Sequence, residues 1–159
     1  MDCAATHNDF GICFATIAQK SFRYPPTEDI EMTLTLTAFY AGLAGLLYLY
    51  LSLYVIKQRI TLRQALGDGG DDTLNRRIRA HGNFNEYAPL TLILIAGFEV
   101  MGAPALLVHL AGIVLIVSRA LHAYGMQGGD KEWGRKYGIL STFALLLVLS
   151  VADILMAIF

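Results

Sequence analysis

The sequence contains little cysteine: two residues among 159, Cys3 and Cys13, both close to the N-terminus. We therefore expect no disulfide framework, no metal site and no cysteine nucleophile. The chain also lacks an excess of charge of either sign, because its formal net charge is −1. This balance predicts neither a nucleic-acid-binding protein nor a polybasic lipid anchor.

Two further features are missing. The glycine-rich stretch GDGGDD at 67–72 has no lysine, so it does not predict a nucleotide-binding loop.

The start MDCAATHND carries acidic instead of basic residues, unlike a secretory signal peptide. Residues 1–31 are therefore expected to form an extension before the domain at 32–159. We expect this extension to be either a poorly ordered tail or a segment upstream of a true translation start at Met32.

Apolar residues are abundant: 55% of the chain is hydrophobic and only 16% is charged. This composition predicts an all-α integral membrane protein, and four runs could cross a bilayer core of about 30 Å. The apolar part of the second run is too short alone, so its helix must begin near Gly82, which brings polar residues into the membrane. The predicted spans are 34–56, 82–101, 104–126 and 136–158.

Basic residues occur in two of the three connections between these spans. The first connection is the richest, and the connection FEVMGAP has none. By the positive-inside rule, both basic loops are expected in the cytoplasm and both termini on the opposite side. The basic residues are Lys57, Arg59, Arg63, Arg76, Arg77 and Arg79 in the first loop, and Lys131, Arg135 and Lys136 in the last.

Polar side chains form a stripe along the second span and the segment before it. Their spacing of i, i+3, i+7 and i+10 is that of one helix face. The third span carries a second stripe, in which Arg119 and His122 are at i and i+3. The first stripe consists of Arg76, Arg79, Asn83 and Glu86, with Tyr87 beside it.

Residue counting predicts that the two stripes lie at matching depths. Glu86 is as far before the short connection as Arg119 is after it, and at 1.5 Å per residue both lie roughly 22 Å in. Asn83 and His122 match in the same way. We therefore expect acid to face base, and amide to face imidazole, across two neighbouring helices.

These stripes have two interpretations. In the first, Glu86 and Arg119 pair only to hold two helices together. In the second, several arginines converge on a cleft and bind an anionic ligand, since guanidinium groups bind carboxylates bidentately. An arginine at the centre of a spanning helix costs about 2.5–3.5 kcal/mol, so both interpretations predict stripes that face protein or water.

Three smaller features lie near the outer ends of the spans. The glycines of YAGLAGL, Gly42 and Gly45, have helical spacing and are expected to allow close helix contact. His109 is expected to face the membrane interface or a neighbouring helix. Glu99 is near an outer end, where its carboxylate is expected to reach water.

The segment GDGGDDTLNRRIRAHGNFNEYAPL, together with SRALHAYGM, resembles the MAPEG family, the membrane-associated proteins of eicosanoid and glutathione metabolism. It is most similar to the small bacterial members, and the resemblance covers residues 32–159. The motif R-A-H-G-N-x-x-E-Y is its specific part. The resemblance implies a four-helix up-down bundle that assembles as a homotrimer in the bacterial inner membrane. It further implies glutathione bound between subunits near the cytoplasmic face.

The resemblance also implies roles for individual residues. Arg135, which opens the fourth helix, matches the arginine that faces the glutathione sulfur in catalytic members, so it is the candidate for stabilising the thiolate. Arg76 is added from the polar stripe as a further binding candidate. The residues that match the family's glutathione contacts are Arg79, Asn83, Glu86, Tyr87, Arg119 and His122.

The sequence departs from the family at two positions. Met126 stands where several eukaryotic members have a tyrosine that contacts glutathione. Ile60 follows Arg59 where some members have a second arginine, and neither Arg59 nor Arg63 is assigned to the site.

Two functions follow from these observations. The first is a glutathione-dependent transferase or peroxidase that uses glutathione as co-substrate and acts on lipophilic electrophiles arriving from the membrane lipid. The second is a non-catalytic trimeric membrane protein that binds a lipid or a partner, because one branch of the family binds lipid without catalysis. Arg119 and Arg135 favour the first function, and Met126 favours the second.

Overall fold

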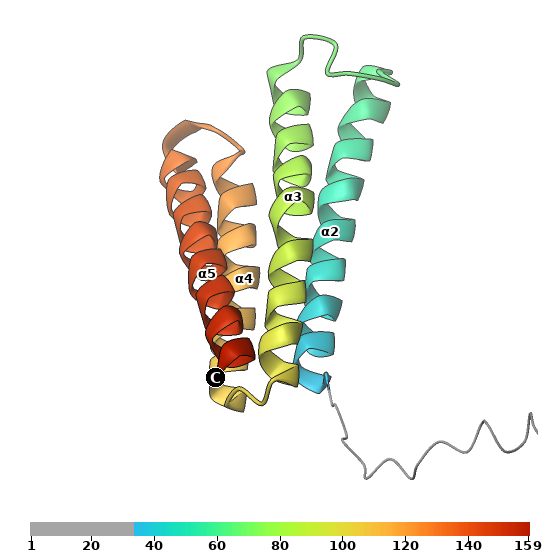
Figure 1. Ribbon diagram of the computed structural model, residues 1–159. Coiled ribbons are helices and arrows are strands. Elements are labelled where there is room, and N and C mark those ends of the chain that lie inside the picture. The colour runs from blue at the N-terminus through green and yellow to red at the C-terminus, as the bar shows by residue number, and fades with distance from the viewer. Residues whose placement is uncertain (1–33) are drawn as a thin grey trace, which may run out of the picture. The chain divides into compact units, whose positions relative to one another are not determined.

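A computed structural model of the protein describes residues 34–159, which form four long helices and one short 3₁₀ turn. Successive long helices run in opposite directions, so the α2–α3 and α4–α5 connections lie at one end (Figure 1). We call this end the basic end, because both connections carry basic residues. The predicted extension at 1–31 lies outside the described residues. The helices are α2 (Thr35–Leu62), α3 (Asp72–Val100), α4 (Ala105–Gly125) and α5 (Glu132–Ile158), with η1 at Gly129–Lys131.

Three helical segments of the described chain are long and apolar enough to cross a membrane: α2, α4 and the segment Gly129–Ile158 that includes α5. α3 is not among them, although at 29 residues it is the longest of the four α-helices. It begins at Asp72, well before the predicted span start at Gly82, because Asp71 caps it by accepting a hydrogen bond of 2.6 Å from the backbone N–H of Leu74. The polar stripe thus lies on continuous helix.

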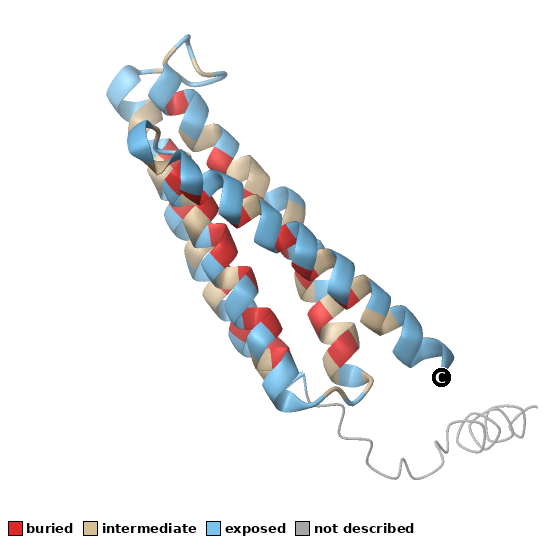
Figure 2. Ribbon diagram, turned by 90° about the vertical axis from the view of Figure 1, so that its left-hand side faces the viewer, coloured by how far each residue is buried: buried red, intermediate tan, exposed pale blue. Residues whose placement is uncertain are grey.

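Buried residues lie where the helices face one another, and exposed residues lie on their outer faces (Figure 2). Many of the exposed side chains are large and apolar. Leu106, Leu147 and Leu46 are 69%, 67% and 67% exposed, respectively. An apolar surface of this extent suits contact with lipid or with another subunit better than contact with water.

Glycines allow α4 and α5 to approach closely near the basic end. A Cβ atom at Gly125 would lie 2.0 Å from the backbone nitrogen of Arg135, and one at Gly138 would lie 2.7 Å from backbone atoms of α4. Gly42 and Gly45 make no such contact within the subunit, because no atom of another helix lies within 4 Å of a Cβ built at either position. Their predicted role in helix contact therefore stays a prediction for contact with another subunit.

At the opposite end, Glu99 holds the start of α2. Its carboxylate accepts hydrogen bonds from the backbone N–H groups of Leu36 at 2.9 Å and Thr37 at 2.7 Å. These bonds satisfy backbone donors that a helix N-terminus leaves unpaired, so Glu99 caps α2. The sequence had predicted only that this carboxylate reaches water. His109 contacts a neighbouring helix, with its Nδ1 3.0 Å from the hydroxyl of Tyr40, which confirms one of its two predicted positions.

Candidate functional site

Arg119 is the largest fully buried side chain of the described part of the chain, with 2% of its surface exposed. Its guanidinium donates to the amide oxygen of Asn83 at 2.7 Å and to the carbonyl of Gly138 at 3.0 Å. It also donates to the hydroxyl of Thr142. The ring of Tyr87 lies beside it, with its centroid 5.6 Å from the guanidinium carbon. One cation therefore joins α3, α4 and α5.

The predicted acid–base pair is not what the structure contains. None of the hydrogen bonds of Arg119 within residues 34–159 goes to Glu86, and Glu86 is exposed. Counting residues predicts how deep a residue lies along a helix, but not the direction in which its side chain projects from the helix axis. In α3, Asn83 projects into the bundle and Glu86 projects outward. The prediction of facing pairs, including Asn83 with His122, was wrong in its partners.

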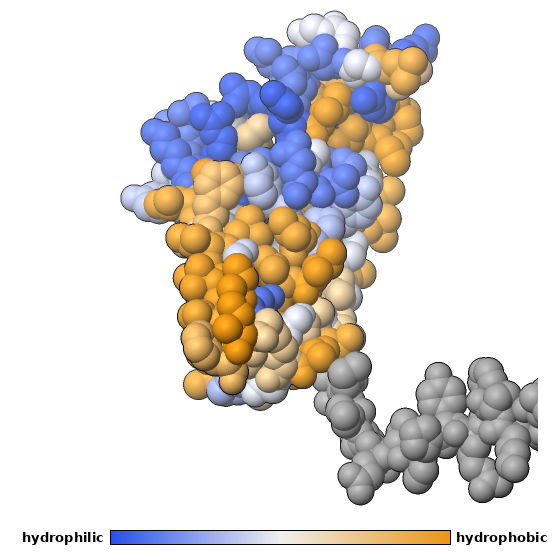
Figure 3. Space-filling view, in the orientation of Figure 1, coloured by the Kyte–Doolittle hydropathy of each residue, from blue (hydrophilic) through white to orange (hydrophobic). Residues whose placement is uncertain are grey.

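An open hollow of about 300 Å³ lies at the basic end. Three predicted arginines line it: Arg76 and Arg79 from α3 and Arg135 from α5. Hydrophilic residues gather at the basic end of the molecule, over the start of α3 and the α4–α5 connection. Apolar residues cover most of the opposite end (Figure 3). The other lining residues are Asp72, Asn75, Met126 and Glu132.

Local structure explains why these arginines meet. Arg76 and Arg79 are at i and i+3 on α3, so they project from the same face of the helix. Arg135 is brought beside them by the close approach of α5 to Gly125. Asn83 and His122 lie about one helical turn deeper than this hollow. Asn83 follows Arg79 by one turn of α3, and His122 precedes Met126 by one turn of α4.

The charges around the hollow are mixed. Three guanidinium groups face two carboxylates, those of Asp72 and Glu132, so the lining carries one net positive charge. All three arginines are exposed, which keeps them hydrated and their fields screened by salt. Such a lining suits a ligand that carries both carboxylate and ammonium groups.

The structure therefore divides the predicted residues into three sets. The hollow brings together Arg76, Arg79 and Arg135. A second, deeper group consists of the buried Arg119 and His122 with the half-buried Asn83 and Tyr87. Glu86 belongs to neither set within the subunit.

Sequence reasoning missed the α5 residues that hold the buried arginine. Thr142 is fully buried and donates to the hydroxyl of Ser118 at 3.0 Å. The sequence did contain a signal for these residues: the apolar run GILST has a glycine and a threonine one helical turn apart. The structure also gives Arg59 a role, because its guanidinium donates to three carbonyls of the α2–α3 loop, the shortest bond being 2.9 Å to Gly67.

Comparison with known proteins identifies the class to which these helices belong. The family model described as the MAPEG family matches residues 37–155. The chain is 38% identical over 118 residues to the inner membrane protein YecN of Escherichia coli strain K12, covering 74% of this chain and 89% of YecN. The YecN of Escherichia coli O6:H1 strain CFT073 matches to the same extent.

The chain is thus a membrane protein, and its described part, residues 34–159, is all-helical. It belongs to the MAPEG family, which confirms the resemblance inferred from its motifs. The name of YecN states a location in the inner membrane and no activity.

Proposed function

We propose that the protein binds glutathione in the basic-end hollow and uses it to modify lipophilic electrophiles, as a membrane-bound transferase or peroxidase. The observation that carries this proposal is the convergence of Arg76, Arg79 and Arg135 on one open hollow beside two carboxylates. Membership of a family that includes glutathione transferases also supports it.

The charges of glutathione complement this lining. At neutral pH the tripeptide carries two carboxylates and one ammonium group. The arginines of α3 provide forked donors for the carboxylates, and Asp72 or Glu132 provides an acceptor for the ammonium. The site then needs no metal ion to hold its ligand.

The chemistry depends on forming the thiolate. A cysteine thiol has a pKa of about 8.5, so glutathione is mostly protonated at neutral pH, whereas the thiolate is the nucleophile. A guanidinium beside the sulfur favours the charged form, and Arg135 is the candidate for this role. In the transferase reaction the sulfur forms a bond to the electrophilic carbon, and the leaving group departs with the bonding electrons.

We further propose that three subunits assemble into a homotrimer, with α3 as a fourth span and the basic end in the cytoplasm. Glu86 is a charged side chain exposed at a depth that the predicted span places in the membrane. A neighbouring subunit, or glutathione bound between subunits, would remove it from lipid. The apolar outer faces of the helices support assembly in the same way.

The test is calorimetric titration of the detergent-purified protein with glutathione. We expect binding in the millimolar range or tighter, weakened about tenfold by Arg79→Gln, since charge-assisted hydrogen bonds contribute roughly 1.5–3 kcal/mol. Lys57→Gln removes the same charge from an exposed site outside the hollow and is expected to leave binding unchanged. Conjugation of bound glutathione to an aryl chloride, with release of chloride, then tests for activity.

Two results would argue against the proposal. Absence of binding at millimolar glutathione would rule out the hollow as a glutathione site. Equal binding by the wild type and Arg79→Gln would locate the ligand elsewhere.

One observation favours the second candidate function, a non-catalytic trimer that binds a lipid or a partner. Both terminal nitrogens of Arg119 donate within the subunit, to Asn83, Gly138 and Thr142, so this chain uses it to join helices. Glutathione binding without any turnover of aryl chloride or lipid hydroperoxide would support this second function.

A further inference from the structure

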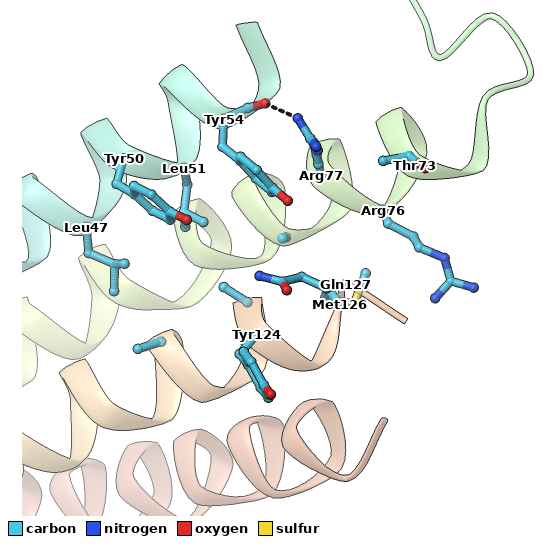
Figure 4. Close-up of a pocket in the computed structure, with 13 residues that line it drawn as sticks. Leu47, Tyr50, Leu51, Tyr54, Thr73, Arg76, Arg77, Tyr124, Met126 and Gln127 are labelled. Carbon is cyan, nitrogen blue, oxygen red and sulfur yellow. Dashed lines mark hydrogen bonds between the residues drawn. The ribbon is translucent and has the colours of Figure 1, made fainter. Parts of the chain in front are cut away.

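A second hollow, of about 260 Å³, lies between α2, α3 and α4 (Figure 4). It shares Arg76 and Met126 with the proposed glutathione hollow but is otherwise lined by different residues. We call it the tyrosine crevice after Tyr50, Tyr54 and Tyr124, which line it from α2 and α4. Apart from Arg76, the proposed glutathione chemistry uses no residue that lines it.

The tyrosine crevice is polar at one end and apolar at the other. Arg76, Arg77 and Gln127 lie towards the end of the crevice where α3 begins, and Leu47 lies at the opposite end, with Tyr50 and Leu51 beside it (Figure 4). Leu47 precedes Tyr54 by about two helical turns, which corresponds to roughly 10 Å along α2. The crevice therefore fits a molecule with a charged head and an apolar chain.

Arg77 is held in a fixed position at the polar end. Its guanidinium carbon is 3.7 Å from the centroid of the Tyr54 ring, and it donates to the backbone carbonyl of Tyr54 at 3.0 Å. Arg77 also lines the crevice, so its positive charge, held in place by Tyr54, attracts an anionic group that enters there.

The position of the crevice identifies the kind of molecule. α2 and α4 are both apolar enough to cross a membrane, and the crevice lies towards their basic ends. Tyrosines are typical of the level where lipid headgroups meet acyl chains. Basic pockets between membrane helices at this level bind anionic lipid headgroups.

We propose that the tyrosine crevice binds an anionic phospholipid from the leaflet at the basic end. The phosphate contacts Arg76 and Arg77, and the first part of one acyl chain lies along Leu47, Leu51 and Ala120. The volume suits the phosphate and this part of the chain, with the rest of the lipid outside among its neighbours.

The test is native mass spectrometry of the purified protein with short-chain phosphatidylglycerol and, separately, phosphatidylcholine of the same chain length. With two arginines at the headgroup, we expect phosphatidylglycerol to bind about tenfold more tightly. Arg77→Gln is expected to remove most of this preference while leaving glutathione binding unchanged. Arg79→Gln, which lines only the other hollow, is expected to retain it.

Two further variants keep the test independent of folding effects. Lys57→Gln removes one charge near the same end without lining the crevice, and it should retain the preference. Ala120→Phe fills the apolar part while leaving the contacts of Arg77 intact, and it should weaken phosphatidylglycerol binding even if Arg77→Gln does not fold. Each variant is first checked by its thermal unfolding midpoint in detergent.

Three results would overturn the proposal. The first is equal binding of the two lipids by the wild type. The second is an equal loss in Arg77→Gln and Lys57→Gln, which would indicate attraction by overall charge. The third is displacement of the lipid by millimolar inorganic phosphate alone, because phosphate cannot occupy the apolar part of the crevice.

Discussion

The guanidinium of Arg119 in α4 donates a 2.7 Å hydrogen bond to the amide oxygen of Asn83 in α3. The same guanidinium reaches α5 through Gly138 and Thr142. A buried cation is costly when it has no partners, yet here neutral acceptors on two neighbouring helices bind both of its terminal nitrogens. Glu86 is thereby left free to face outward.

This contact predicts strong energetic coupling between the two residues. Arg119→Met removes the buried donor and is expected to lower the free energy of unfolding by about 2 kcal/mol or more, because charged hydrogen bonds contribute about 1.5–3 kcal/mol. In a double-mutant cycle with Asn83→Ala, we expect a coupling energy of about 0.5–3 kcal/mol. The measurement is reversible unfolding in mixed detergent micelles.

A matched cycle tests whether the pairing is specific. Arg119→Met combined with Glu86→Gln is expected to be additive within about 0.5 kcal/mol, because the two residues share no hydrogen bond. Coupling of Arg119 to Glu86 that exceeds its coupling to Asn83 would restore the ion pair and contradict the observed geometry.

A second prediction concerns the close approach of α4 and α5. In Gly125→Ala, the new methyl group would lie 2.0 Å from the backbone nitrogen of Arg135, so the helices must move apart. We expect a loss of about 1–3 kcal/mol of stability from overpacking. Glutathione binding should weaken as well, because the start of α5 positions Arg135. Thermal unfolding and calorimetry measure the two effects.

Gly82→Ala is the control for this prediction. Gly82 lies within α3, and no atom lies within 4 Å of a Cβ built there. Alanine is the better helix former, so stability should stay unchanged or rise by about 0.5–1 kcal/mol. A loss in Gly82→Ala as large as that in Gly125→Ala would mean that packing of α4 on α5 is not the cause.

Much of the fold could be predicted because lipid-spanning helices leave simple signals. Long apolar runs and the short connection FEVMGAP indicated helices of alternating direction, as the structure has them. The predicted start of the second helix, near Gly82, is too late, because that prediction rested on the apolar run. The helical spacing of Arg76, Arg79 and Asn83 already indicates helix further back, and the cap made by Asp71 places its start at Asp72.

The three arginines that meet at the hollow could be named from the sequence, but the hydrogen-bond partners of the polar residues could not. Helical spacing correctly grouped Arg76 with Arg79, and the family motif added Arg135 from a distant segment. The pairing of polar groups depends on how each helix is rotated about its axis and on the distance between the helix axes. This rotation and distance depend on glycines such as Gly138, whose contact with α4 has no local sequence signature.

A third prediction concerns assembly. We expect cross-linking in mild detergent to give trimers. The open faces at Gly42 and Gly45 are candidates for contact with another subunit, since small residues let membrane helices pack closely. Gly45→Leu should then reduce the trimer fraction without changing the helical content of the subunit. Leu46→Met, at an exposed neighbouring position, is the control. Monomers in several mild detergents would contradict the assembly.

The last prediction concerns the ionisation of bound glutathione. If Arg135 lies beside the sulfur, its positive charge favours the thiolate and lowers the pKa of the bound thiol. Arg135→Gln should therefore raise that pKa by about 1 or more, since a nearby opposite charge typically shifts a pKa by about 1–3. At a pH below both values, the thiolate fraction and the rate of conjugation should fall about tenfold.

Ultraviolet absorbance of the thiolate, titrated against pH in saturating glutathione, measures this pKa directly. The rate of conjugation should rise with pH through the same value, and in Arg135→Gln the whole profile should move to higher pH. Lys136→Gln removes a charge from the adjacent residue, which is exposed and does not line the hollow, so its profile should match the wild type. An unchanged thiol pKa in Arg135→Gln, with glutathione still bound, would limit this arginine to holding the ligand.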